Sequence, residues 1–408
     1  MKIGLIATSI WDSLHLDLAR EMTRQGHDIV VYTEDNRAPS GMSFTRLDED
    51  GLHFWIIHGF RRNPLTWLFD RLFKFWLGRR FFTTLVAIWR FIRANRDREV
   101  FVVEADWLGF FVGIVSLFEN FRWVVGIHDT DYLDAPIDFP GRPVSRWRTG
   151  VQRWVLRRAD AVRSNSWVTT KALVAGGCPA QKIATIPLHY LPGRMLLPAH
   201  VPLMEFRAAS RARVLPELGI PADGELLITM CRVTWVKRLE LAVEALAAAL
   251  PQRPQLWLAI CGGDRNLRGL GSYAGHLRAV AERLGVAHRL LLPGDIESLR
   301  VKEYLAAADL HLAPSWVDTF NYGVVEATLA GTPSLMSPGV GAAPWIIDFG
   351  AGRLVEDDAA AAWGEAIRAA LEFPTTADRR LAAQQKLMHT LSPAVTAPQV
   401  VRCWAGHA

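Results

Sequence analysis

The sequence predicts an α/β protein of two domains, each built on a doubly wound parallel sheet. Its 408 residues are too many for one ordinary core and suit two domains of roughly 200 residues each. Half of the residues are hydrophobic and 21% are charged, as in ordinary globular proteins. Short apolar runs typical of buried strands alternate with helical patterns, and this alternation occurs in two cycles.

The first cycle begins with a strand–helix–strand unit. We expect a strand at 2–7, an amphipathic helix at 14–25 that Gly26 ends, and a second strand at 28–33. Further strands are expected, with helical stretches between them, at 100–103, 123–127, 161–164 and 183–186. Residues 1–195 are therefore predicted to form a parallel α/β domain.

A connection and the second cycle follow. Residues 191–206 contain three prolines and no clear periodicity, and we interpret 196–210 as the linker. The second domain, 211–389, should contain strands at 226–231, 255–261, 290–292, 310–313 and 334–336, with helices at 239–250, 273–284, 299–307 and 322–330. Ligands of such sheets bind beyond the carboxyl ends of the strands, so the loops there should carry the chemistry.

The ends of the chain and its cysteines indicate a cytoplasmic protein. The apolar start is followed at once by Asp12 and lacks a small-residue cleavage site, so it is interpreted as a buried strand rather than a signal peptide. No run of 18 uncharged apolar residues would span a membrane. Four scattered cysteines without CxxC spacing favour a reducing compartment. Residues 390–408 carry an apolar set that we expect to cross back to the first domain.

Residues 59–98 concentrate the positive charge of the chain. This segment holds ten Lys or Arg against two Asp, a local charge of +8, and ten aromatic residues, whereas the whole chain carries +5. Basic side chains interleaved with Trp and Phe suit an anionic membrane surface at the cytoplasmic face. Two alternatives stay open: core helices whose Arg stems cover apolar surface, and nucleic-acid binding. The helical spacing of the aromatics argues against nucleic acid.

The stretch 313–333 is the most informative for chemistry. A loop leaves a strand and enters a helix whose first free amides, near Asn321, Tyr322 and Gly323, could hold a phosphate with the help of the helix dipole. Asp318 in the loop and Glu326 on the helix could accept hydrogen bonds from sugar and ribose hydroxyls. The alternative is that Glu326 only caps or solvates its helix.

Two other loops carry residues that suit a phosphate ligand. Arg232 and Lys237 lie five positions apart after the first strand of the second domain, where both could neutralise a diphosphate without a metal. The alternative is an ordinary solvated loop charge. Gly262 and Gly263 follow the next strand and would let a backbone approach a ligand closely, although any tight turn favours glycine.

These loops resemble those of retaining GT-B glycosyltransferases, above all glycosyltransferase family 4. Pro314-Ser315, Phe320, Glu326-Ala327 and Ala330-Gly331-Thr332-Pro333 match the E-x7-E signature of that family in register. The resemblance implies a nucleotide-sugar site at Arg232, Lys237, Gly262, Gly263, Phe320, Asn321, Tyr322, Gly323 and Glu326, with Asp318 and Glu326 as the two acids. It also implies His128, after the strand at 123–127, as a third catalytic candidate near the donor sugar, although a histidine there is often structural.

The sequence departs from the family pattern at three places. Asp318 replaces the usual first Glu, Asn321-Tyr322 replaces a Gly after the Phe, and the loop at 8–13 lacks the frequent Gly-Gly. Asp129 and Asp131 could be mistaken for the DxD metal motif of the other large glycosyltransferase fold. Because Arg232 and Lys237 can serve the phosphates, we expect no metal and no cofactor besides the donor.

The resemblance implies transfer of a sugar, with retained anomeric configuration, from a UDP- or GDP-linked donor. The expected acceptor is a lipid-linked saccharide or a surface-polysaccharide precursor, because 59–98 lies in the acceptor-binding domain of such a fold. A catalytically weak sugar-nucleotide-binding scaffold and an inverting GT-B enzyme remain the rival interpretations.

Overall fold

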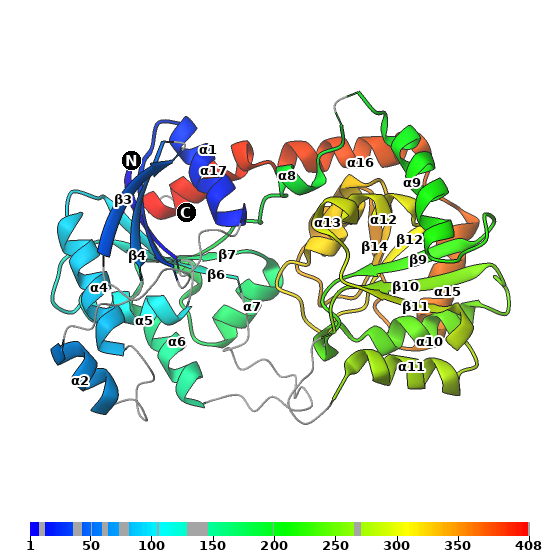
Figure 1. Ribbon diagram of the computed structural model, residues 1–408, viewed down its shortest axis with the longest axis horizontal. Coiled ribbons are helices and arrows are strands. Elements are labelled where there is room, and N and C mark those ends of the chain that lie inside the picture. Colours follow the sequence, from blue (N-terminus) through cyan, green and yellow to red (C-terminus); the bar gives the residue numbers. More distant parts are fainter. Residues whose placement is uncertain are drawn as a thin grey trace. The chain divides into compact units, whose positions relative to one another are not determined.

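The computed structural model describes residues 1–7, 13–35, 43–49, 51–58, 64–72, 81–103, 106–128, 146–198, 200–264 and 271–406. Within these ranges, everything up to His189 and the end from Pro393 onward belongs to one unit, and Tyr190–Ser392 forms a second. Each unit has its own parallel-stranded sheet and its own hydrophobic core (Figure 1). The predicted fold class, two doubly wound α/β domains, is confirmed.

The first unit contains an eight-stranded sheet in the order β3-β4-β2-β1-β5-β6-β7-β8. Its strands are β1 (Lys2–Ile6), β2 (Asp28–Asp35), β3 (Ser43–Glu49), β4 (Leu52–His58), β5 (Val100–Val103), β6 (Trp123–Ile127), β7 (Ala161–Ser164) and β8 (Ile183–Thr185). Its helices are α1 (Ser13–Arg24), α2 (Pro64–Leu72), α4 (Phe81–Ala94), α5 (Asp106–Val115), α6 (Arg146–Arg158), α7 (Trp167–Ala175) and α17 (Pro393–Ala405).

The edge of this sheet differs from the prediction. Strands β3 and β4 form an antiparallel hairpin, whereas every other neighbouring pair in the sheet is parallel. The sequence-based prediction contained no strands at 43–49 and 52–58, so this antiparallel edge was not foreseen. The missed signal is Asp50-Gly51, a pair that favours tight hairpin turns, and Gly51 has a φ of 80°.

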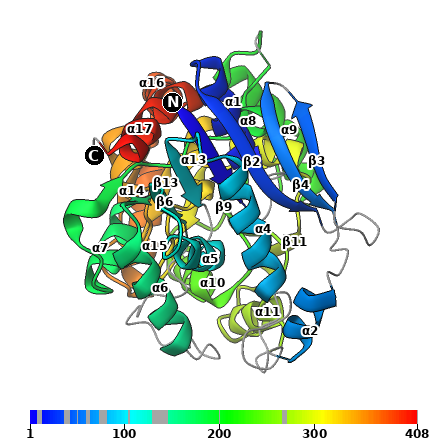
Figure 2. The same ribbon diagram turned by 90° about the vertical axis from the view of Figure 1, so that its left-hand side faces the viewer.

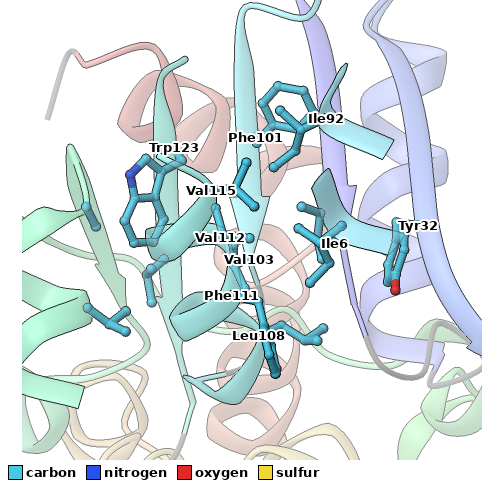
Figure 3. Close-up of a cluster of buried hydrophobic side chains, with 14 of the residues drawn as sticks. Ile6, Tyr32, Ile92, Phe101, Val103, Leu108, Phe111, Val112, Val115 and Trp123 are labelled. Carbon is cyan, nitrogen blue, oxygen red and sulfur yellow. The ribbon is translucent and has the colours of Figure 1, made fainter. Parts of the chain in front are cut away.

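Helices cover both faces of the first sheet. Helices α4 and α5 bury their apolar sides against β5 and β6, and Figure 3 shows Phe111 and Val112 close to Val103. On the other face α17 lies beside α1 (Figures 1 and 2) and buries Val400 and Trp404 against the sheet. The end of the chain, which the sequence analysis expects to cross back, thus lies in the first unit.

The second unit contains a six-stranded, wholly parallel sheet in the order β11-β10-β9-β12-β13-β14. Its strands are β9 (Glu225–Met230), β10 (Leu256–Cys261), β11 (Leu290–Gly294), β12 (Leu310–Ala313), β13 (Ser334–Met336) and β14 (Gly352–Leu354). Its helices are α8 (Pro192–Met195), α9 (Leu203–Glu217), α10 (Leu239–Ala249), α11 (Tyr273–Arg283), α12 (Val301–Ala307), α13 (Tyr322–Leu329), α14 (Ala343–Asp348), α15 (Ala360–Glu372) and α16 (Ala377–Thr390).

The passage between the units lies earlier than the predicted linker. The chain leaves the first unit after His189, and residues 196–210 belong to the second unit. The prolines in this region start helices instead of marking a free connection: Pro192 is the first residue of α8, and Pro202 is the N-cap of α9. Proline favours the first helical position, which Pro192 occupies, because its fixed φ suits the helix and its missing N–H would have no partner there.

The basic aromatic segment, 59–98, falls partly outside the described residues, at 59–63 and 73–80. Within it, α4 packs Ile88, Phe91 and Ile92 into the core, as the alternative of core helices expects. Helix α2 instead exposes Leu68, Phe69 and Leu72, the last of them 62% exposed. None of the helices in the described ranges is both long and apolar enough to cross a membrane.

Candidate active site

The strand order of the second sheet locates the site. The order reverses between β9 and β12, the two strands from which the chain winds outward in opposite directions. Open α/β sheets bind ligands beyond the carboxyl ends of the strands at such a switch point, since the two loops there leave room between them. The loop with Arg232 and Lys237 follows β9, and the loop with Asp318 follows β12.

Backbone hydrogen bonds tie these loops to their neighbours. The amide of Val233 donates to the carbonyl oxygen of Gly263 at 3.0 Å, and the amide of Trp316 donates to Val236 at 3.0 Å. Gly262 has a φ of 142°, and a Cβ there would lie 1.8 Å from the carbonyl oxygen of Cys231. Gly262 is therefore required by the close approach of two strand ends. The loops form one frame around the switch point.

Lys237 and Asp318 form an ion pair across the switch point, with 13% and 12% of their side chains exposed. Burial lowers the pKa of Lys237, but attraction to Asp318 and a hydrogen bond from the ammonium group to that carboxylate outweigh burial, so the pKa lies above its ordinary value. Lys237 thus stays charged, and the site holds a cation beside the carboxylate of Asp318.

The start of α13 lies close to the end of β9. Asn321, the N-cap of this helix, has a φ of 71°, in the left-handed region that asparagine tolerates better than most residues. A Cβ on Gly323 would lie 2.7 Å from the carbonyl oxygen of Met230, so only glycine fits without a shift. Phe320 is buried, and its ring centroid lies 5.4 Å from that of Tyr322. Phe320 therefore anchors the loop, and the amides that follow begin the helix at the switch point.

Glu326 is buried on α13, only 4% exposed. Its Oε1 lies 3.2 Å from Nε of Arg194, a residue of α8, and Nη2 of Arg194 donates to Oε2 at 3.4 Å. Burial raises the pKa of Glu326 to about 7, although Arg194 acts to lower it. The raised pKa means that the ionised form of this buried carboxyl group is costly. Such strongly shifted pKa values are typical of functional sites.

The remaining candidates lie at different places. Arg232 is exposed just after the end of β9. A Cβ on Gly263 would lie 2.6 Å from the carboxylate of Asp295, so a larger residue would require Asp295 to shift. His128 follows β6 in the first unit and is half-buried. Asp129 and Asp131 lie outside the described residues. In the described ranges, no group of three or more His, Cys, Asp or Glu side chains could hold a metal ion.

Two residues of this region were not predicted from the sequence. Arg194 contacts Glu326 from a segment that was interpreted as leading into the linker. His311 on β12 is buried, with Nδ1 3.2 Å from Ser334 Oγ, and burial lowers its pKa to about 3, so it is neutral. His311 also lines a small cavity under the switch point, together with Met230, Lys237, Ser315 and Asn321. A histidine inside a buried strand was the available signal.

Two family models match this chain. The model for glycosyl transferases group 1 matches residues 210–387, and that for the glycosyl transferase 4-like domain matches residues 15–189. The predicted resemblance is confirmed in both halves of the chain.

The curated relatives include D-inositol 3-phosphate glycosyltransferases. That of Acidothermus cellulolyticus is 28% identical over 258 residues, 62% of this chain and 54% of the relative. That of Streptomyces coelicolor is 30% identical over 178 residues, 42% of this chain and 37% of the relative. The chain spans about half the length, or less, of these relatives.

Solved structures agree over the whole chain. Sucrose-phosphate synthase from Thermosynechococcus elongatus superposes with a TM-score of 0.74 at 18% identity, covering 99% of this chain and 98% of that one. Anabaena HepE in complex with UDP-glucose superposes with a TM-score of 0.71 at 17% identity, covering 99% of each chain. At such identities the likeness shows the fold alone. Together with the two family models, it shows that the chain belongs to the GT-B glycosyltransferases of the family 4 type.

Proposed function

We propose that this protein transfers a hexose from a nucleoside diphosphate sugar to a carbohydrate acceptor, with retention of anomeric configuration and without a metal. The observation that carries the proposal is the arrangement at the switch point: Lys237 paired with Asp318, beside the first turn of α13. A cation and the free amides of a helix start are the groups that bind a diphosphate. UDP is the first nucleotide to test, because HepE binds UDP-glucose.

The geometry supports a division of roles. Lys237, with Arg232 at the exposed rim, would stabilise the diphosphate as it leaves, since its charge is already fixed in place before reaction. Asp318 would exchange part of its contact with Lys237 for a hydroxyl of the donor sugar. Glu326 would accept hydrogen bonds from the ribose. The departing phosphate would take the acceptor's proton on the same face of the sugar, so no protein nucleophile is needed.

Calorimetric titration with UDP and with GDP, in the presence of a chelator, tests the site. Saturable binding of one nucleotide, unaffected by the chelator, supports the proposal and names the base. Incubation with the matching nucleotide sugars then tests turnover through release of the free nucleotide. Binding without any transfer or hydrolysis would favour the rival, a scaffold protein, which the shorter side chain of Asp318 motivates. NMR of the first-formed product distinguishes retention from inversion.

We further propose that the acceptor is a lipid-linked saccharide or polysaccharide precursor reached at an anionic membrane surface. Support comes from α2, which exposes Leu68, Phe69 and Leu72 within a segment whose local charge is +8. Apolar side chains among basic ones bind anionic lipid by insertion and by charge attraction.

Flotation with vesicles tests this membrane proposal. Leu68→Ser combined with Leu72→Ser should reduce binding to anionic vesicles at low salt about tenfold. Phe373→Ser is the matched control, since Phe373 is an equally apolar residue, 75% exposed, in the second unit. If the wild-type protein ignores anionic vesicles, or if the control lowers binding as much as the double variant, the proposed surface is wrong.

A further inference from the structure

Arg194 occupies an unusual place in the chain. It lies on α8, a short helix just after the chain leaves the first unit at His189. The amide of Tyr190 donates to the carbonyl oxygen of Leu391 at 2.9 Å, so the outgoing segment is paired with the segment that returns after Ser392. From this junction the guanidinium of Arg194 reaches Glu326. A side chain at the crossing thus contacts one of the two acids of the site.

The other charged groups around α13 are committed elsewhere. Arg207 from α9 donates to the carbonyl oxygen of Ala330, and Arg380 from α16 binds that of Gly331, both at the far end of the helix. His311 on β12 is neutral, and Lys237 is paired with Asp318. Among the described residues, Arg194 is the charged group that lowers the pKa of Glu326, against a larger effect of burial.

The contact between Arg194 and Glu326 orients the carboxylate but leaves one of its oxygens able to accept a hydrogen bond from a ligand. Both carboxylate oxygens lie near the guanidinium, at 3.2 Å and 3.4 Å, which fixes the plane of the group. Within the described part of the chain, however, Oε1 makes no hydrogen bond of good geometry. A buried acceptor oxygen without a hydrogen bond is costly, and a ligand hydroxyl would satisfy it.

We propose that Arg194 is a positioning residue, which orients the carboxylate of Glu326 and favours its charged form, so that it can accept hydrogen bonds from the ribose hydroxyls of the donor. Occupancy of the nucleotide site is thereby linked to the segment on which the chain passes between units. This inference rests on the proposed function, because it takes the ligand to be a nucleoside diphosphate.

Calorimetry with UDP, or with GDP if that is the nucleotide bound, tests the role across about pH 6 to about pH 9. Arg194→Met should lower the affinity about tenfold at neutral pH, because a neutral Glu326 loses charge-assisted bonds. The affinity should recover at higher pH, with the midpoint of its pH profile shifted upward by about one unit. Arg194→Lys should keep most of the nucleotide affinity that Arg194→Met loses. The 2′-deoxynucleotide, which keeps only the 3′-hydroxyl, should show a smaller difference in affinity between the two proteins.

Arg213→Met is the matched control. Arg213 forms an Arg–Glu ion pair with Glu303 at 3.0 Å in the same unit, between α9 and α12, and its loss should leave nucleotide affinity unchanged. Tighter or equal binding by Arg194→Met at every pH would overturn the proposal, because Arg194 would then only cover the site. A uniform loss, with the pH midpoint unmoved and the deoxynucleotide equally affected, would also overturn it and assign a purely structural role.

Failure of the proposed function gives a different result. If neither UDP nor GDP binds the wild-type protein, the nucleotide site itself is wrong, and the inference falls with it. Unfolding by urea across the same pH range gives a readout without nucleotide: Arg194→Met should shift the titration of Glu326 to higher pH, and an unshifted profile would overturn the electrostatic role.

Discussion

Asp318 and Glu326, the two acids of the candidate site, are each paired with one cation. In the first pair the pKa shift favours the charged form of the lysine, whereas in the second it disfavours the charged form of the glutamate. Asp318 and Lys237 lie in loops on either side of the switch point, similarly buried, and the pKa of Lys237 is raised. Glu326 lies on a helix, almost fully buried, opposite an arginine that is 31% exposed, and its pKa is raised to about 7. The lysine of the first pair keeps its charge at neutral pH, whereas the glutamate of the second pair is close to half-protonated.

The Lys237–Asp318 pair is compatible with a stable fold, whereas the ionised form of Glu326 lowers the stability of the fold. Lys237 and Asp318 compensate each other's burial, so each protects the other until a ligand arrives. Glu326 gains too little from Arg194 to offset its own burial, and holding it ionised in the folded state costs up to about 3 kcal/mol. Under the proposed function, Glu326 serves binding at a cost in stability, and the loop pair serves both the fold and the ligand.

The largest effect is expected for Lys237→Met. It leaves the carboxylate of Asp318 buried without its partner, which should lower the free energy of unfolding by about 3 kcal/mol. It also removes the cation that we propose binds the diphosphate, so nucleotide affinity should fall about 100-fold by calorimetry. Adding Asp318→Asn should restore most of the stability but none of the affinity. Normal affinity in the double variant would show that Lys237 serves only the fold.

Glu326→Gln should separate stability from activity. A folded-state pKa of about 7, above the ordinary 4.5, means that the folded protein binds the extra proton, so stability from this group falls as pH rises from 4.5 through 7. The neutral variant should therefore be more stable than the wild type at about pH 8, by up to about 3 kcal/mol, and no more stable at about pH 4. The rate of sugar transfer by this variant should fall about 100-fold.

Urea unfolding at both pH values checks the effect of Glu326→Gln. Glu303→Gln is the control, because Arg213 and Arg300 satisfy the carboxylate of Glu303 and its loss should give no gain in stability. If Glu326→Gln destabilises the protein at high pH, the Arg194 pair is a structural ion pair after all, and the contrast between the two acids disappears.

Gly323→Ala tests the close contact between the start of α13 and the end of β9. The new methyl group would lie 2.7 Å from the carbonyl oxygen of Met230, and relief of this overlap should cost about 1–3 kcal/mol in unfolding free energy. Nucleotide affinity should fall about tenfold as the amides of α13 move. Gly275→Ala on α11 is the control: its nearest neighbour is a Ser272 oxygen at 3.4 Å, so it should be neutral or stabilising.

Much of the second unit follows from its sequence, for a physical reason. Strands β9, β10 and β12 are short apolar runs buried on both faces, and their period and flanking loops are local features. The loops that carry Lys237 and Asp318, and the helix start at Gly323, were predicted from the same local pattern. The roles of these residues as ligands remain predictions.

What the sequence did not predict depends on contacts between distant segments. The pairing of Arg194 with Glu326 joins residues 132 positions apart, and no local pattern announces it. The prolines near α8 and α9 fit both a linker and a helix start, and only the packing of α9 on α12 decides between them. The hairpin of β3 and β4 was missed although its turn signal is local, so that omission was avoidable.

The smallest effect is expected for Asp318→Glu, which replaces the shorter acid of this chain with the usual one. The longer carboxylate can still reach Lys237, so the free energy of unfolding should change by less than about 1 kcal/mol. If Asp318 faces the donor sugar while Glu326 faces the ribose, kcat should change within about tenfold, and affinity for the bare nucleotide should stay as in the wild type. Steady-state kinetics alongside nucleotide titration separates the two quantities. A weakened affinity for the nucleotide, with kcat unmoved, would mean that both acids serve the nucleotide and that the contrast between them lies in their pKa values alone.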